Sequence, residues 1–211
     1  MFSPIRSSFI VLAVCVSSTS LASAASVVRQ PGQHPHYSVE LEPHFVWTWG
    51  WLPHAANDGL GVGLRASIPF IHNGPIDTIN NNMAITFGFD WAHSSAHCGP
   101  GLRPPPGYPP DYYADYYNCS ANSYWLPVAL QWNFFLTDII SVFGEPGLAF
   151  VHHRWSRWVP CGAGVSCEYG DSATELHPAL WGGARFMFSD TFGVTVRLGV
   201  PSISAGLSIL L

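Results

Sequence analysis

Positions 37 to 51 (YSVELEPHFVWTWGW) alternate between two kinds of side chain. Large apolar residues take most of the odd positions, and polar or small residues take most of the even ones. Successive side chains of a β-strand point to opposite faces, so the pattern predicts one long strand with an apolar and a polar face. The stretch exceeds the roughly 5–6 residues of an ordinary strand and the about 9–11 tilted residues that cross a bilayer.

The same alternation returns in seven later segments, so the sequence predicts eight strands. After positions 37–51, these are residues 60–70, 83–92, 124–136, 140–150, 176–188, 192–200 and 202–211. Two-residue turns at Thr137-Asp138 and Ser189-Asp190 alternate with long irregular connections near 93–123 and 152–174. This rhythm is typical of outer-membrane barrels, in which short periplasmic turns alternate with long external loops.

Charged residues are scarce in this chain. They make up 10% of the 211 residues, whereas soluble domains average about 25%, so the surface is not an ordinary solvated one. The net charge of -5 speaks against nucleic acid as a partner. Apolar runs are too short for a membrane-spanning helix to be expected.

The N-terminus has the features of a secretory signal peptide. Arg6 precedes the apolar segment 9–16, and Ala22-Ser23-Ala24 fits the small-residue cleavage rule. We therefore expect a signal peptide at 1–24, a short periplasmic leader at 25–36 and the barrel at 37–211.

Four cysteines remain after removal of the signal peptide: Cys98, Cys119, Cys161 and Cys167. An even number in an exported protein predicts two disulfides. The pairs Cys98–Cys119 and Cys161–Cys167 are favoured because each lies within one loop. The alternatives are free thiols or a metal site with His97. The chain has no Cys-x-x-Cys, so no metal site is predicted.

Alternation alone fits either a soluble sandwich with an inward apolar face or a membrane barrel with an outward one. The polar face favours the barrel, because it is rich in glycine and carries both signs of charge. Eight strands leave an interior just wide enough for side chains, and buried charges persist when they are paired. The predicted lumen charge network consists of Glu40, Glu42, Arg65, Asp90, Glu145, Arg185 and Arg197.

From about residue 37 to 211, the chain resembles the small eight-stranded outer-membrane β-barrels of bacteria, which include the OmpA transmembrane domain, OmpX and the opacity proteins. The resemblance is one of pattern, and Leu211 departs from the aromatic residue that usually ends such chains. It implies an all-β, antiparallel up-and-down transmembrane barrel in the bacterial outer membrane. Its expected partners are the bilayer, lipopolysaccharide and the outer-membrane assembly machinery, and a monomer is expected.

These features predict a non-enzymatic membrane protein with a plugged lumen, no cofactor and no catalytic residues. Its disulfide-bearing external loops would contact an external ligand or protein. One alternative is a lipid-modifying barrel enzyme, and a second is a soluble exported β-sandwich or lipocalin-like binding protein. The enzyme would use rim residues with the chemistry of a base, a nucleophile and an acid: His93, Ser94, Ser95, His152, His153, Glu168 and Asp171. Histidines 93, 97, 152 and 153 are also the residues that could bind a metal between loops.

Overall fold

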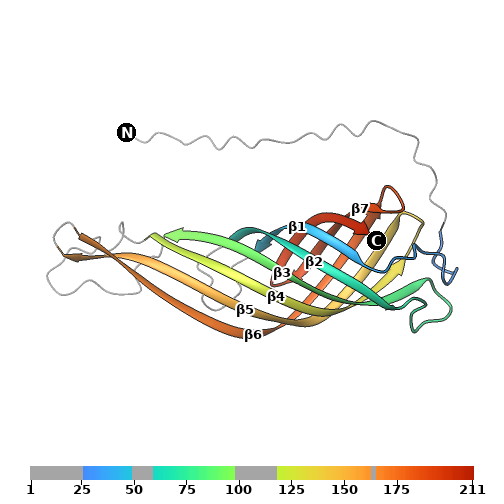
Figure 1. The fold of residues 1–211 in the computed structure, drawn as a ribbon, viewed down its shortest axis with the longest axis horizontal. Helices are drawn as coiled ribbons and strands as arrows, with labels where there is room; N and C mark the ends of the chain where they lie inside the picture. The colour runs from blue at the N-terminus through green and yellow to red at the C-terminus, as the bar shows by residue number, and fades with distance from the viewer. Residues whose placement is uncertain (1–25, 49–58, 98–117, 163–164) are drawn as a thin grey trace, which may run out of the picture.

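A computed structural model describes residues 26–48, 59–97, 118–162 and 165–211. Within these ranges the strands are β1 (Glu40–Thr48), β2 (Gly59–Ile71), β3 (Asn81–His97), β4 (Asn118–Phe135), β5 (Ile140–Gly162), β6 (Val165–Met187), β7 (Phe192–Val200) and β8 (Ser202–Leu210). Each strand is antiparallel to its neighbours, and β1 pairs with β8 to close the barrel (Figure 1). The structure confirms the predicted fold class.

No helix in the described part of the chain is long and apolar enough to cross a membrane. The predicted signal peptide, at 1–24, lies outside the described residues.

The barrel wall has its apolar face outside and its polar face inside. On β1, Glu40 and Glu42 are each 1% exposed, whereas Phe45 is 75% exposed. Other strands repeat this arrangement, with Leu60, Val128 and Leu198 exposed on the outer surface. A soluble sandwich would bury such side chains between its sheets. The distribution of apolar side chains outside and polar side chains inside is therefore that of a barrel whose outer surface faces lipid.

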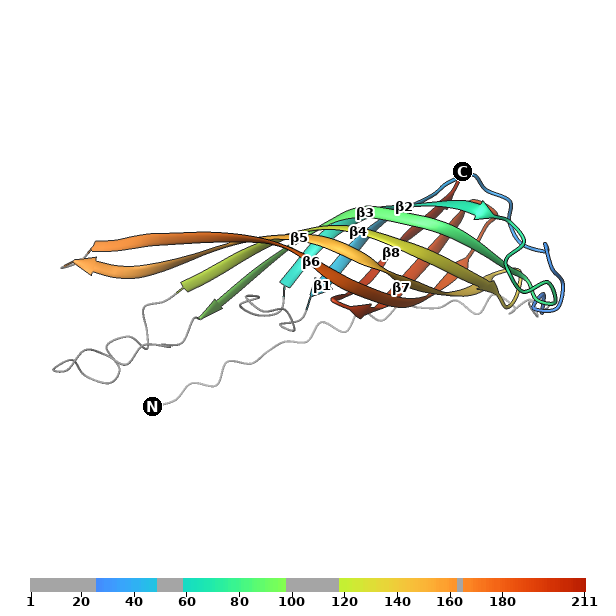
Figure 2. The same ribbon diagram turned by 90° about the horizontal axis from the view of Figure 1, so that it is seen from below.

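Strands β3 to β6 continue past the barrel at one end, and β5 and β6 extend furthest (Figures 1 and 2). This corrects the expected loop at 152–174, because β5 runs to Gly162 and β6 begins at Val165. It also shortens the expected loop at 93–123, because β3 reaches His97 and β4 begins at Asn118. Outside the membrane neither face of a sheet has to be apolar, so backbone pairing continues where the alternation of side chains stops.

The first strand is shorter than its sequence pattern. It spans Glu40 to Thr48, and the end of the pattern, Trp49 to Trp51, lies outside the described residues. Just before β1, the backbone N–H groups of Ser38 and Val39 both donate to the carbonyl oxygen of Leu211. The C-terminal residue is thereby hydrogen-bonded to the start of the barrel.

Substituting arginine for Leu130 should destabilise the barrel. Leu130 is 37% exposed and lies midway between Leu126 and Phe134 on the outer face of β4, and a cation near the bilayer midplane costs about 2–4 kcal/mol. Leu41→Arg, at the start of β1, should cost roughly 0–1 kcal/mol because the effect falls toward the interface. Urea unfolding from lipid vesicles measures both, with Leu130→Ala as the control. Equal costs at the two sites would contradict the proposed bilayer position.

Candidate functional site

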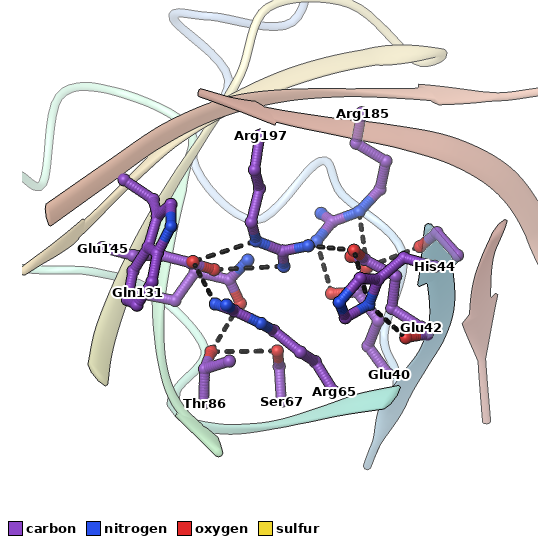
Figure 3. A network of polar contacts seen from close by, with 12 residues as sticks. Glu40, Glu42, His44, Arg65, Ser67, Thr86, Gln131, Glu145, Arg185 and Arg197 are labelled. Carbon is purple, nitrogen blue, oxygen red and sulfur yellow. Dashed lines mark hydrogen bonds and ion pairs between the residues drawn. The ribbon is translucent and has the colours of Figure 1, made fainter. Parts of the chain in front are cut away.

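All seven charged residues predicted for the lumen are nearly inaccessible to solvent. Figure 3 shows all of them except Asp90 inside the barrel. They come from six strands: Glu40 and Glu42 from β1, Arg65 from β2, Asp90 from β3, Glu145 from β5, Arg185 from β6 and Arg197 from β7. Alternation explains their position, because each occupies an inward-facing place on its strand. Closure of the barrel then brings residues from distant parts of the sequence together.

Arg197 lies at the centre of this network. Its Nε donates to Glu145 Oε2 at 2.9 Å and its Nη2 to Glu145 Oε1 at 3.2 Å, while its Nη1 contacts Glu42. Two parallel bonds to one carboxylate are the strong geometry for an arginine. Arg197 therefore connects the carboxylates of β1 and β5 across the lumen.

Arg65 extends the network to β3. Its Nη1 lies 3.4 Å from Glu145 Oε2, and its Nη2 lies 3.0 Å from Asp90 Oδ2. Glu145 thus interacts with both Arg65 and Arg197. A carboxylate buried at 0% exposure requires such partners, since an unpaired charge in the interior is very costly.

His44 belongs to this network, although sequence reasoning left it out of the charged set. Its Nε2 lies 2.9 Å from Asp90 Oδ1, and its Nδ1 lies 3.0 Å from the carbonyl oxygen of Glu42. Each ring nitrogen therefore faces an acceptor oxygen. Four carboxylates thus share the lumen with three guanidinium groups and one imidazole. The sequence feature that could have placed His44 in the network was its inward position on β1, two residues after Glu42.

A separate pair lies closer to the end of the barrel that carries the β6–β7 turn. Arg185 Nε donates to Glu40 Oε1 at 2.8 Å, Arg185 Nη2 contacts Glu40 Oε2, and the hydroxyl of Ser208 also donates to Glu40. The guanidinium carbon of Arg185 lies 5.6 Å from the ring centre of Phe143, and that of Arg197 lies 5.0 Å from it. Phe143 therefore packs between the two parts of the network.

Glycines make room for these large side chains. A Cβ atom on Gly63 would collide with Asp90 and His44, and one on Gly183 would collide with the ring of Phe143. The small residues predicted for the polar face therefore leave the volume that the charged network occupies.

A layer of aromatic and aliphatic side chains covers the network on the side of the extended β5–β6 sheet. Trp125, Ala149, Val151, Ala179 and Trp181 form a buried cluster. The guanidinium of Arg65 lies 4.3 Å from the ring centre of Trp181, which is a cation–π contact. The space that Trp125 and Trp181 border together with Val46 and Asp90 has no room for a water molecule.

The leader folds over the other end of the barrel, next to the turns (Figure 2). The backbone N–H of Val27 donates to Leu136, and the ring of His34 stacks on Phe135 with centres 4.6 Å apart. Asn80 holds the leader at two points, because its backbone N–H donates to Val28 and its side-chain amide donates to Gln33 at 2.6 Å. This side chain is 1% exposed.

The predicted rim residues divide between the two faces of the sheet. His93 and His152 are exposed on the outer face and bind Asn122 and Thr174. His153 is buried on the inner face, where its Nδ1 lies 2.8 Å from the hydroxyl of Ser123. Sequence reasoning missed Ser123, which only the pairing of β4 with β5 brings beside His153.

The acids proposed for a catalytic arrangement, Glu168 and Asp171, are exposed on β6. No group of His, Cys, Asp and Glu suited to a metal occurs among the described residues.

The predicted disulfides stay predictions. Cys98 lies outside the described residues, and the side chains of Cys119, Cys161 and Cys167 are not described. The backbone places Cys119 opposite Ala96 of β3 and Cys167 opposite Val159 of β5.

Removing Arg185 alone should destabilise the barrel by about 3–5 kcal/mol, because Glu40 would keep a buried charge without its main partner. We expect Arg185→Met with Glu40→Leu to restore most of that loss, since replacing both members of a buried ion pair is often close to neutral. Unfolding in urea from vesicles tests this for the single and double variants. A single variant within about 1 kcal/mol of wild type would argue that the pair contributes little.

Loss of the Asn80 side chain should loosen the leader without unfolding the barrel. Asn80→Ala removes the hydrogen bond to Gln33, so backbone amides of residues 27–34 should exchange with solvent faster. Hydrogen exchange measures this, and Asp77→Ala, an exposed change in the same loop, serves as the control. Unchanged exchange in the leader would show that other contacts are sufficient to hold it.

No protein-family model matches this sequence, and no curated protein matches it. Solved structures with a related fold include Ail, the attachment invasion locus protein of Yersinia pestis, which aligns at 14% identity over 83% of this chain and 99% of that one, with a TM-score of 0.43. Ail in complex with the heparin analogue sucrose octasulfate aligns at 14% identity over 82% of this chain and 97% of that one, with a TM-score of 0.41. The fold assignment rests on the strand pairing of this chain itself. By that pairing, the protein has the fold of the small eight-stranded outer-membrane β-barrels.

Proposed function

We propose that this protein is an integral bacterial outer-membrane barrel with a non-enzymatic role in surface contact. The observation that carries the proposal is the sheet that rises from the external end of a closed barrel with a filled lumen. The barrel anchors this sheet, and the sheet presents the contact surface.

The distribution of polarity supports a position in a membrane. Phe45, Leu60 and Leu180 are 75%, 72% and 61% exposed on the outside, where a soluble protein would expose them to water at a large cost. Charged side chains are meanwhile paired in the interior. Since a closed barrel leaves no unpaired strand edge in the lipid, the backbone is also satisfied there.

Three groups of residues, stacked along the barrel axis, support the proposal that the lumen conducts no ions. The leader lies over the periplasmic end, the charged network fills the middle, and the cluster with Trp125 and Trp181 covers its external side. An ion crossing the barrel would have to displace paired buried charges and a layer of packed side chains.

The proposed contact surface is the external part of β5 and β6. Residues of β6 before Leu180 pair with β5, whereas pairing with β7 begins at Leu180. Among the described residues, β6 therefore has a second backbone edge without a strand partner, and such edges accept added strands. The arginines and acids in this part of the sequence are Arg154 and Arg157 on β5 and Glu168, Asp171 and Glu175 on β6. Their net charge of -1 favours a cationic partner.

Purified protein in planar bilayers should show no conductance steps. The physical reason is the filled lumen, because eight strands leave room only for side chains. The positive control is a porin reconstituted in the same way. Reproducible steps that scale with the amount of this protein would contradict the plugged lumen.

Labelling of introduced cysteines tests the orientation. Ser172→Cys on the external part of β6 should react with a membrane-impermeant maleimide on intact cells. Asp190→Cys, in the turn between β6 and β7, should react only after the outer membrane is permeabilised. Wild-type protein measures the background from native cysteines. The reverse labelling pattern would overturn the orientation, and extraction without detergent would overturn the membrane location.

Shortening the external sheet tests the contact role. Trp155 to Asp171 can be replaced by Asn-Gly, because Arg154 and Ser172 face each other in the β5–β6 ladder. The shortened barrel should still show heat-modifiable mobility on gels, while cells that carry it should attach less well to a cationic polymer surface. Neutral and anionic surfaces are the controls. Equal attachment of wild-type and shortened proteins would refute the contact role.

The Ser123–His153 contact supplies a specific observation for the enzyme alternative, yet its burial argues against it. His153 is 1% exposed and Ser123 is 8% exposed, and both lie on the inner face, away from the lipid-facing surface. A lipid-modifying enzyme needs its nucleophile where lipid can reach it. We therefore assign this pair a packing role in the proposed function.

A further inference from the structure

A polar hollow lies on the outer face of the sheet that extends past the barrel (Figure 2). Its volume is about 230 Å³, which is below the roughly 300–1,000 Å³ of pockets that enclose drug-sized ligands. The residues that line it are mainly polar: Ser120, Asn122, Tyr124, Arg154, Trp155, Ser156 and Glu168. Its size and lining suit a single small polar unit of a ligand.

Small residues on three neighbouring strands create the hollow. Ser120 of β4 pairs with Ser156 of β5, which pairs with Gly170 of β6. The two serine hydroxyl groups are 3.1 Å apart. A Cβ atom on Gly170 would meet only the backbone oxygen of Trp155, at the ordinary contact distance of 3.6 Å. Packing therefore does not demand a glycine at this position, and its missing side chain keeps the floor of the hollow open.

The hollow lies beyond the lipid headgroups. Leu126, Phe150 and Leu176 are the last large apolar residues before the outer face of β4, β5 and β6 becomes polar, and each is more than half exposed. Asn122 lies four residues beyond Leu126, about 10 Å further from the bilayer centre for a strand rise of 3.3 Å and a tilt near 40°. The polar region of a bilayer is roughly 5–8 Å thick on each side. The ligand of this hollow therefore reaches it from water.

Asn122 and Arg154 provide hydrogen-bond donors on one side of the hollow. They face each other in the ladder between β4 and β5. The side-chain oxygen of Asn122 accepts hydrogen bonds from Trp91 at 3.2 Å and from His93 at 3.1 Å, which fixes the side chain and leaves its amide nitrogen for a ligand. Arg154 is exposed and forms no ion pair with a residue that the structure describes.

Glu168 provides an acceptor on the other side. It is exposed on β6, two positions before Gly170, whereas Arg154 pairs with Ser172, two positions after it. One positive and one negative group thus face each other across the serine floor. A purely anionic ligand would be repelled by Glu168, and a purely cationic one would be repelled by Arg154. The hollow is therefore suited to a neutral ligand that both donates and accepts hydrogen bonds.

We propose that the hollow binds one neutral hexose unit of a carbohydrate from outside the cell, an inference that rests on the proposed role in surface contact. Sugar hydroxyl groups both donate and accept, so one ring can use the amide, guanidinium, carboxylate and serine hydroxyl groups together. The backbone of β5 beneath the hollow already pairs with β4 and β6, so recognition there depends on side chains. An extended peptide would instead need a free backbone edge.

Saturation-transfer NMR and titration calorimetry of the full chain, in a detergent without a sugar headgroup, test this proposal. The probes are neutral tetrasaccharides of glucose, mannose and galactose. At least one should bind wild-type protein with a dissociation constant of about 1 mM or tighter. Gly170→Leu fills the hollow and should weaken that binding about tenfold or more. Thr174→Leu, an exposed change four positions along the same face and outside the hollow, should bind like wild type.

The charge of Glu168 separates a neutral sugar from an anionic one. Glu168→Gln keeps the shape of the side chain but replaces a charged acceptor by a weaker one, so a neutral sugar should bind several-fold more weakly. Tighter binding in this variant, or a preference of wild type for a sulfated tetrasaccharide, would overturn the proposal. Wild-type affinity in Gly170→Leu, or no binding of any of the three neutral sugars, would also overturn it.

The source of the sugar and the proposed function are tested separately. Competition by the cell's own lipopolysaccharide that is stronger than competition by the free sugar would place the ligand in the same membrane and refute an external source. Heat-modifiable mobility, cysteine labelling and attachment of the shortened protein report the barrel and its contact role without any sugar. If these three give the expected results and the sugars fail to bind, the hexose site is wrong and the proposed function stands.

Discussion

The pairing of buried charges inside the closed barrel is the interaction on which the rest of the structure depends. Glu145 is the clearest case, because it is fully buried and interacts with both Arg65 and Arg197. An opened barrel would leave these groups without partners in a region where unpaired charges are very costly. Strand closure and charge pairing therefore stabilise each other: the ladder from β1 to β8 brings the charges together, and their pairing holds the wall around them.

The same sheet is adapted to two surroundings. Within the lipid, its outer face is apolar and its lumen holds large polar side chains beside glycines such as Gly63 and Gly183. Beyond Leu126 and Phe150, the outer face becomes polar while the backbone pairing of β4 with β5 continues. Because a sheet in water can be polar on both faces, the strands extend far outside the barrel.

The proposed role as an anchor rather than a channel depends on the packed interior and on the raised sheet. Trp181 covers the charged network on one side, and the leader, held by Asn80, lies over the opposite end. In the proposed function, the part available for recognition is the external β5–β6 sheet.

Alternation of side chains determined the eight strands, the inward position of the seven charged residues and the outward position of residues such as Phe45, because period two is a local property of an extended chain. Only the tertiary structure decided which charges meet. Glu40 contacts Arg185, 145 positions away, since barrel closure sets which residues face each other across the lumen. The role of His44, the contact of Ser123 with His153 and the length of β5 and β6 were likewise decided by strand register and pairing. These depend on neighbouring strands, and no local pattern of apolar residues records them.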